Sequence, residues 1–143
     1  MEHDPQAEYR RVNEALVRRL PELRTEYERE IAEWGEEMGP HVIYAAILNP
    51  YVTRLLESKD SASEEDLRRV FAVLEDLVAD PMTADVVITE VGEHLASDRD
   101  LLGRARLFMG PLMAEHTRDR LPFRRPRRFR EKPPWARSRR PRR

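Results

Sequence analysis

The sequence predicts an all-α protein of six or seven short helices followed by a basic tail. Through residues 1–120, apolar side chains recur at i, i+3, i+4 and i+7, the spacing of one buried helix face. No stretch alternates polar and apolar residues long enough to indicate a strand. From Leu121 onward, Arg and Pro dominate and cannot form a core. We therefore expect an all-helical domain over residues 1–120 and a disordered tail over residues 121–143.

Three apolar stripes predict the first three helices. The first consists of Tyr9, Val12, Leu16 and Leu20, and Pro21 ends it. The second consists of Leu23, Tyr27, Ile31 and Trp34, and Gly35 ends it. The third runs from Val42 to Leu55 and contains Pro50. Because Pro50 has no N–H to donate to the carbonyl of Ala46, this helix must kink there or begin again.

Four further helices are predicted in the second half. Ser63, with Asp66 three residues later, indicates a helix start before the stripe of Leu67, Val70, Phe71, Leu74, Leu77 and Val78. Asp80 ends that helix, and Pro81 begins the next, which extends to Ala96. Ser97 opens another helix that reaches Met109. A last short helix runs from Leu112 to about residue 120.

Short links between successive helices favour antiparallel neighbours. The order of the helices, hairpin by hairpin, favours a helical-repeat-like stack, although no sequence repeat of fixed period is present. A closed bundle is the alternative.

The near-zero net charge of −1 hides two opposite charges. Residues 121–143 hold 11 basic and one acidic side chain, or +10, whereas residues 1–120 hold 15 basic and 26 acidic ones, or −11. An acidic domain attracts cationic partners, but the same charge also keeps a protein soluble.

Several classes of chemistry have no support in the sequence. The chain has no Cys, which excludes disulfides, thiolate metal sites and a Cys nucleophile. Its five Gly residues do not form a phosphate-binding loop, and no two histidines are spaced as metal ligands on one helix. We expect no catalytic, cofactor or metal site, and we expect His94 to pair with a neighbouring carboxylate. Because Met1–Pro5 is acidic and no apolar segment follows, we also expect a cytoplasmic protein.

Glu33, Trp34, Glu36 and Glu37 are the candidate partner-binding residues. A large aromatic residue among charged groups is typical of an interface anchor. The apolar stripe favours another interpretation, in which Trp34 completes the core-facing side of its helix.

In the tail, the candidate nucleic-acid-binding residues are Arg124, Arg125, Arg127, Arg128 and Arg130. Arginines neutralise phosphates, and the interleaved aromatic residues Phe123, Phe129 and Trp135 can stack on bases. An anionic membrane surface, the acidic domain of the same chain, or no partner at all are the alternatives.

A series of short motifs occurs in a fixed order between Leu20 and Pro111. They are Glu33-Trp34-Gly35, Gly39-Pro40-His41, Leu48-Asn49-Pro50-Tyr51, Leu55-Leu56-Glu57, Arg69-Val70-Phe71 with Leu74-Glu75, and Ala105-Arg106-Leu107-Phe108-Met109-Gly110-Pro111. In this order they resemble an uncharacterised family of small, all-helical bacterial proteins built as a short helical-repeat stack. No catalytic residues come with the resemblance, and the Arg/Pro tail departs from the family's usual ending.

The family is similar in size and character to immunity proteins of bacterial toxin systems. From this similarity and from the acidic charge of residues 1–120, we infer a non-enzymatic module whose acidic face binds a basic, toxin-like partner. A nucleic-acid-associated protein that binds through its tail is the alternative. The Asn-Pro-Tyr motif predicts that Asn49 leaves the α region and caps the following helix, with Tyr51 facing the core or a neighbouring helix.

Overall fold

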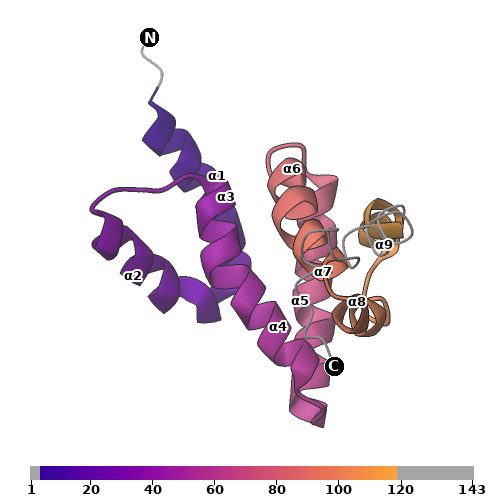
Figure 1. Cartoon of the computed structure of the whole chain (residues 1–143). Helices are drawn as coiled ribbons and strands as arrows, with labels where there is room; N and C mark the ends of the chain where they lie inside the picture. Colours follow the sequence, from indigo (N-terminus) through magenta and orange to yellow (C-terminus); the bar gives the residue numbers. More distant parts are fainter. Residues whose placement is uncertain (1–3, 119–143) are drawn as a thin grey trace, which may run out of the picture.

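A computed structural model of the chain describes residues 4–118 (Figure 1). Within this range every regular element is helical and no strand is present, so the all-α prediction is confirmed. None of these helices is long and apolar enough to cross a membrane. The arginines that we assign to nucleic-acid binding lie outside the described residues.

The helices follow the predicted order. The first half contains α1 (Pro5–Arg19), the 3₁₀ turn η1 (Pro21–Leu23), α2 (Arg24–Trp34), α3 (Pro40–Ile43), the π-helical turn η2 (Tyr44–Leu48) and α4 (Asn49–Glu57). The second half contains α5 (Ser61–Ala79), α6 (Ala84–Val86), the π-helical turn η3 (Val87–Gly92), α7 (Glu93–Ala96), α8 (Arg99–Ala105) and α9 (Pro111–Arg118).

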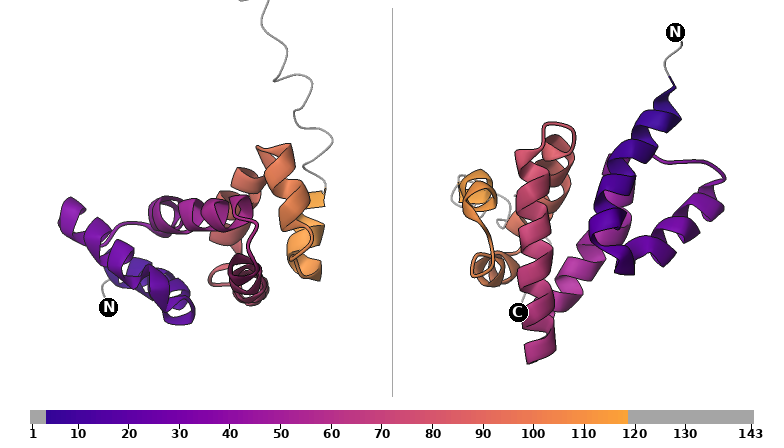
Figure 2. Two further views of the ribbon diagram at one scale, coloured as in Figure 1. Left: turned by 90° about the horizontal axis from the view of Figure 1, so that it is seen from below. Right: turned by 180° about the vertical axis from the view of Figure 1, so that it is seen from behind.

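The long helix α3–η2–α4 crosses the middle of the molecule and separates two groups of helices (Figures 1 and 2). On one side, α1 and α2 join at η1 and diverge, and residues 35–39 return the chain to α3. On the other side, α5 runs back from the end of α4, and α6–η3–α7 lies beside it. Because α9 contacts both α5 and η3, the second half closes on itself, as in the bundle alternative.

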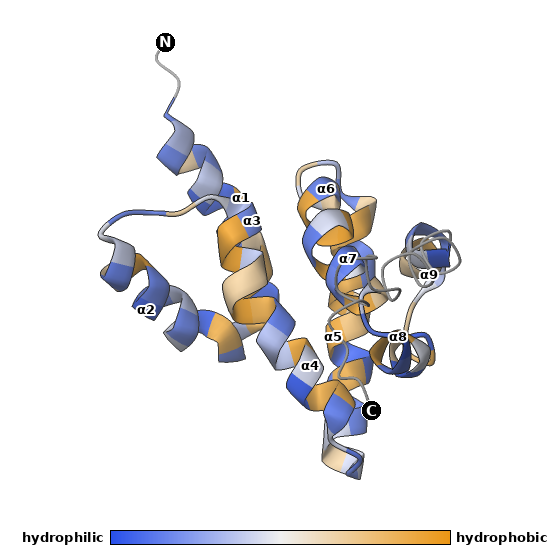
Figure 3. Cartoon of the chain, viewed as in Figure 1, coloured by the Kyte–Doolittle hydropathy of each residue, from blue (hydrophilic) through white to orange (hydrophobic). Residues whose placement is uncertain are grey.

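One continuous core joins the two groups. Its largest fully buried side chains include Leu16 from α1 and Leu20 directly after it, Tyr44 and Leu48 from η2, and Phe71 and Leu74 from α5. The colouring in Figure 3 shows apolar faces on α3 and α5, whereas α2 is mainly hydrophilic. The predicted apolar stripes of α1 and α5 therefore contribute to this core.

Pro50 neither ends the third helix nor lies at a cap. The π-helical turn η2 comes directly before it, where the missing N–H interrupts the α-helical ladder. Asn49 has helical angles (φ −60°, ψ −44°), so the prediction that it caps the next helix is wrong. Its Nδ2 instead donates to the carbonyl of Glu90 in η3, at 3.2 Å, because packing between the two helices outweighs the local preference.

Two helix starts differ from their predicted positions because an Asp provides the cap. Asp60 accepts a hydrogen bond from the N–H of Ser63 at 2.8 Å, so α5 begins before Ser63. Asp98 accepts from the N–H groups of Asp100 and Leu101, so it replaces Ser97 as the cap of α8. That helix also ends at Ala105, before Met109. Pro81 lies in the turn before α6 rather than inside a helix.

The start of α9 is capped by a residue from a distant helix. The carboxylate of Glu75, in α5, accepts hydrogen bonds from the N–H groups of Leu112 at 2.6 Å and Met113 at 3.1 Å. Gly110 makes this approach possible, since a Cβ there would lie 2.5 Å from the Glu75 carboxyl carbon. The Met-Gly-Pro motif therefore has a structural role in docking α9 on α5.

We predict that Glu75→Ala lowers the free energy of unfolding by about 1–2 kcal/mol, because two backbone N–H groups lose their acceptor. Urea denaturation measures this change. Glu65→Ala, at an exposed position of the same helix, is the matched control and should cost less than about 0.5 kcal/mol. Equal stability of the two variants would contradict the capping role of Glu75.

Candidate partner-binding surface

Trp34 lies at the surface, at the last residue of α2. The left-handed conformation of Gly35 (φ 81°) ends the helix immediately after it. Along the predicted stripe, Tyr27 is buried, Ile31 is half-buried, and Trp34 is 56% exposed. The interpretation that places Trp34 in the core is therefore wrong, because α2 diverges from α1 toward its end (Figure 1).

Carboxylates flank this exposed ring in the sequence, and one of them contacts it. The indole Nε1–H of Trp34 donates to Glu30 at 3.2 Å, and Glu33 and Glu36 are exposed. Glu36 accepts a hydrogen bond from the side-chain amide of Gln6 at 2.7 Å. We call Glu30, Glu33, Trp34 and Glu36 the acidic surface. Within residues 4–118, none of its three carboxylates forms an ion pair.

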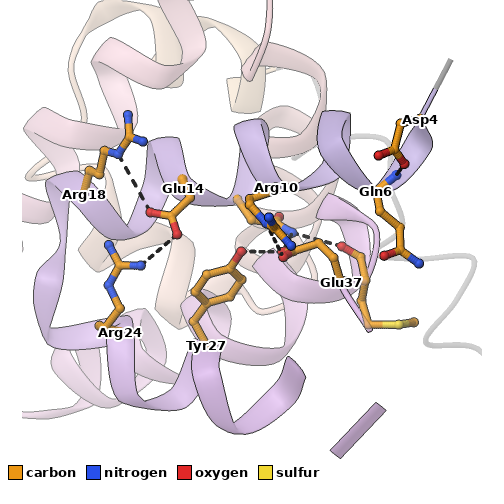
Figure 4. A network of polar contacts seen from close by, with 10 residues as sticks. Asp4, Gln6, Arg10, Glu14, Arg18, Arg24, Tyr27 and Glu37 are labelled. Carbon is orange, nitrogen blue, oxygen red and sulfur yellow. Dashed lines mark hydrogen bonds and ion pairs between the residues drawn. The ribbon is translucent and has the colours of Figure 1, made fainter. Parts of the chain in front are cut away.

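Glu37, the fourth predicted partner-binding residue, is not on this surface. It is only 4% exposed and lies between α1 and α2 (Figure 4). Its carboxylate accepts hydrogen bonds from the Tyr27 hydroxyl, from Asn13 Nδ2 at 2.9 Å and from Arg10 Nε at 3.3 Å. The prediction grouped Glu37 with Glu33 and Glu36 because they are neighbours in the sequence, but after Gly35 the chain turns and buries this side chain.

These hydrogen bonds make Glu37 the centre of a buried polar network. A buried carboxylate is tolerated only when donors satisfy it, and here the donors come from both α1 and α2. Asn13 Nδ2 also donates to the carbonyl of Met38 at 2.9 Å, which holds the segment that follows α2. Burial and the hydrogen bond to Glu37 raise the pKa of Tyr27, so its hydroxyl remains a donor.

Two further clusters join the helices. Arg24 donates to Glu14 at 2.8 Å, and this contact lowers the pKa of the Glu14 carboxyl and links α2 to α1 (Figure 4). Burial alone would raise the pKa of Glu22, but hydrogen bonds from Arg69 and Tyr51, both at 2.5 Å, outweigh it and lower that pKa. Burial and the same contact raise the pKa of Tyr51 to about 12.

The histidines do not form a metal site within residues 4–118, where no three His, Asp or Glu side chains are grouped to hold an ion. His41 Nδ1 lies 2.8 Å from Glu90 in η3. His94 Nε2 lies 2.7 Å from the hydroxyl of Thr53, so its predicted pairing with a carboxylate is wrong. Both contacts link α3–α4 to the helix beside it.

We did not predict the Glu37 network from the sequence, although one signal of it is present there. Asn13 lies on the same face as Leu16 and Leu20 and is fully buried. A polar residue in the middle of an apolar stripe indicates a buried hydrogen-bonding partner. Its partner, 24 residues further along the chain, follows from no local pattern.

The fold and this surface define a small all-α protein with an exposed tryptophan beside unpaired carboxylates. Over residues 13–121, the chain matches a domain of unknown function, DUF7674, and it belongs to that family. This agrees with the resemblance to an uncharacterised family. No curated protein and no solved structure matches the chain.

We predict that Glu37→Ala lowers the free energy of unfolding by about 2–4 kcal/mol, because Tyr27 and Asn13 lose a buried acceptor. Glu36→Ala, one residue away and exposed, is the matched control and should cost less than about 0.5 kcal/mol. Chemical denaturation of both variants tests the difference, and a double-mutant cycle with Tyr27→Phe isolates the coupling. A coupling energy near zero would show that the network does not stabilise the fold.

Proposed function

We propose that this chain is a non-enzymatic protein-binding module of the bacterial cytoplasm that uses the acidic surface to bind a basic partner. An inhibitor of the immunity or antitoxin type acts in this way, by covering a basic, toxin-like protein. The exposure of Trp34, which contacts the Glu30 carboxylate and is flanked in the chain by the exposed Glu33 and Glu36, is the observation that carries the proposal.

Trp34 has the properties of an interface anchor. Tryptophan is enriched among residues that dominate binding energy, because its large ring removes much apolar surface from water when a partner covers it. The Glu30 carboxylate restrains the ring in the free protein through the indole N–H. A restrained side chain loses less conformational entropy on binding.

The unpaired carboxylates suit a cationic partner. Because no Lys or Arg of residues 4–118 forms an ion pair with Glu30, Glu33 or Glu36, their charges remain available. Such charges accelerate encounter with a basic surface and make it sensitive to salt. The net charge of −11 over residues 1–120 acts in the same direction at longer range.

The alternative function is nucleic-acid binding through the tail. The observation that favours it is the +10 charge of residues 121–143, with Phe123, Phe129 and Trp135 among the arginines. This proposal involves residues outside the described range and is independent of the acidic surface. Removal of residues 122–143 separates the two functions.

We predict that Glu33→Lys/Glu36→Lys abolishes capture of a basic protein partner from the native host, because it replaces attraction by repulsion. Capture with the wild type, this variant and Trp34→Ala, followed by binding kinetics of the recovered protein at several salt concentrations, tests this. The charge reversal should slow association and reduce its dependence on salt, whereas Trp34→Ala should speed dissociation.

Glu65→Lys is the matched control, since it reverses an exposed charge on α5, a helix that contributes no residue to the acidic surface. It should leave capture and kinetics unchanged. Unchanged affinity and salt dependence in Glu33→Lys/Glu36→Lys would contradict binding through the acidic surface. Nucleic acid recovered only by the chain that retains its tail would support the alternative.

A further inference from the structure

Leu107 is the most exposed large apolar side chain in the part of the chain that the structure describes, at 75%. It lies in the turn that follows α8. Its N–H donates to the carbonyl of Arg104 at 3.1 Å, and the N–H of Phe108 donates to the carbonyl of Ala105 at 2.9 Å. These hydrogen bonds fix the backbone of the turn, so Leu107 is held at the surface by a defined conformation.

Phe108, the next residue, holds two cations beside its ring. It is half-buried and stacks on the buried ring of Phe71, with the ring centres 6.4 Å apart. The guanidinium groups of Arg68 and Arg104 lie 5.9 Å and 5.6 Å from the centre of the Phe108 ring, within cation–π range. Arg104 is fixed further, because its Nε donates to the carbonyl of Leu56 at 2.9 Å.

This region is positively charged, in contrast to the acidic domain that carries it. Residues 101–114 contain Arg104 and Arg106 and no acidic residue. Arg106 is exposed and forms no ion pair within residues 4–118. Arg68 lies 3.6 Å from Glu64, an exposed contact of a kind that contributes little to stability. We call Arg68, Arg104, Arg106, Leu107 and Phe108 the basic–apolar surface.

The basic–apolar surface and the acidic surface complement each other. One has an exposed Leu107 with arginines, and the other has the 56% exposed Trp34 with unpaired carboxylates. They lie on opposite sides of the long helix α3–η2–α4, because α2 belongs to one group of helices and α8 to the other (Figures 1 and 2). The two surfaces are therefore too far apart to meet within one molecule, and a second copy can bring them together.

We propose that the basic–apolar surface of one copy binds the acidic surface of a second copy. Trp34 and Leu107 form the apolar centre of this contact, and the carboxylates of one copy face the arginines of the other. Because each copy then keeps one free surface of each kind, the association proceeds head to tail. The segment 121–143, with its charge of +10, is repelled by the same arginines and does not compete for them.

The contact rests on the acidic surface of the proposed function and adds a second occupant for it. Self-association covers Trp34 and must be reversed before another basic partner binds there. Two anchors and a few exposed charges make a small interface, for which we expect a Kd of about 0.1–1 mM. The chain is therefore a monomer at micromolar concentrations and associates where it is concentrated.

Sedimentation velocity of the full chain, from about 10 µM to about 1 mM, tests the proposal. The weight-average mass should rise with concentration, and about 0.5 M salt should weaken the association at least about tenfold, because it screens exposed charges. Leu107→Glu and Trp34→Ala should each remain monomeric over this range. Met82→Glu is the matched control, since it places the same charge at an apolar side chain that is 42% exposed and outside both surfaces, and it should associate as the wild type does.

A mixture of the two monomeric variants makes the sharpest test. Leu107→Glu keeps an intact acidic surface, and Trp34→Ala keeps an intact basic–apolar surface, so one productive contact is available between them. An equimolar mixture at about 1 mM should form heterodimers and no larger species. This result also shows that both variants are folded.

A wild-type chain that stays monomeric at about 1 mM in low salt would overturn the proposal. Wild-type association by Leu107→Glu would overturn it as well, and so would a mixture of the two variants that stays monomeric. Self-association is measured on the purified chain. Failure to capture a basic protein from the host would thus contradict the proposed function and leave this result unchanged.

Discussion

The buried carboxylate of Glu37 constrains the whole N-terminal half of the structure. Excluded from water, it requires donors, and these come from α1 through Asn13 and Arg10 and from α2 through Tyr27. The segment after Gly35 is therefore held between two helices. As a result, the chain turns sharply at the end of α2, and Trp34 and Glu36 remain on the outer side of that turn.

The long helix α3–η2–α4 shares the apolar core with the helices on both sides of it. Polar contacts of its side chains also connect it to the helices on both sides. Tyr51 and Arg69 meet at Glu22, and Asn49 and Thr53 reach the neighbouring helix at Glu90 and His94. Of these residues, Asn49, Tyr51 and Arg69 belong to the motifs that carried the family resemblance. Their contacts give the motifs a structural explanation, in the same way that Glu75 explains Gly110-Pro111.

The repeat of apolar residues within each helix predicts the helices well. It predicts the candidate partner-binding surface less well, because that surface depends on how separate helices pack. The stripe of α5 determines a buried face because its residues repeat within one helix, and the sequence shows that repeat directly. The burial of Glu37 and the exposure of Trp34 depend instead on where α2 diverges from α1, which no repeat encodes. Asn49 likewise adopts a helical conformation before Pro50 because a partner 41 residues away binds its side chain.

The proposed function depends on the exposure of Trp34 in acidic surroundings. Collisional quenching of its fluorescence, in a Trp135→Phe chain where it is the one tryptophan, tests that claim most directly. Carboxylates attract caesium and repel iodide, so caesium should quench Trp34 more strongly than iodide, and neutral acrylamide should quench it readily. Protection from acrylamide would place Trp34 in the core, and stronger quenching by iodide would contradict the acidic surroundings.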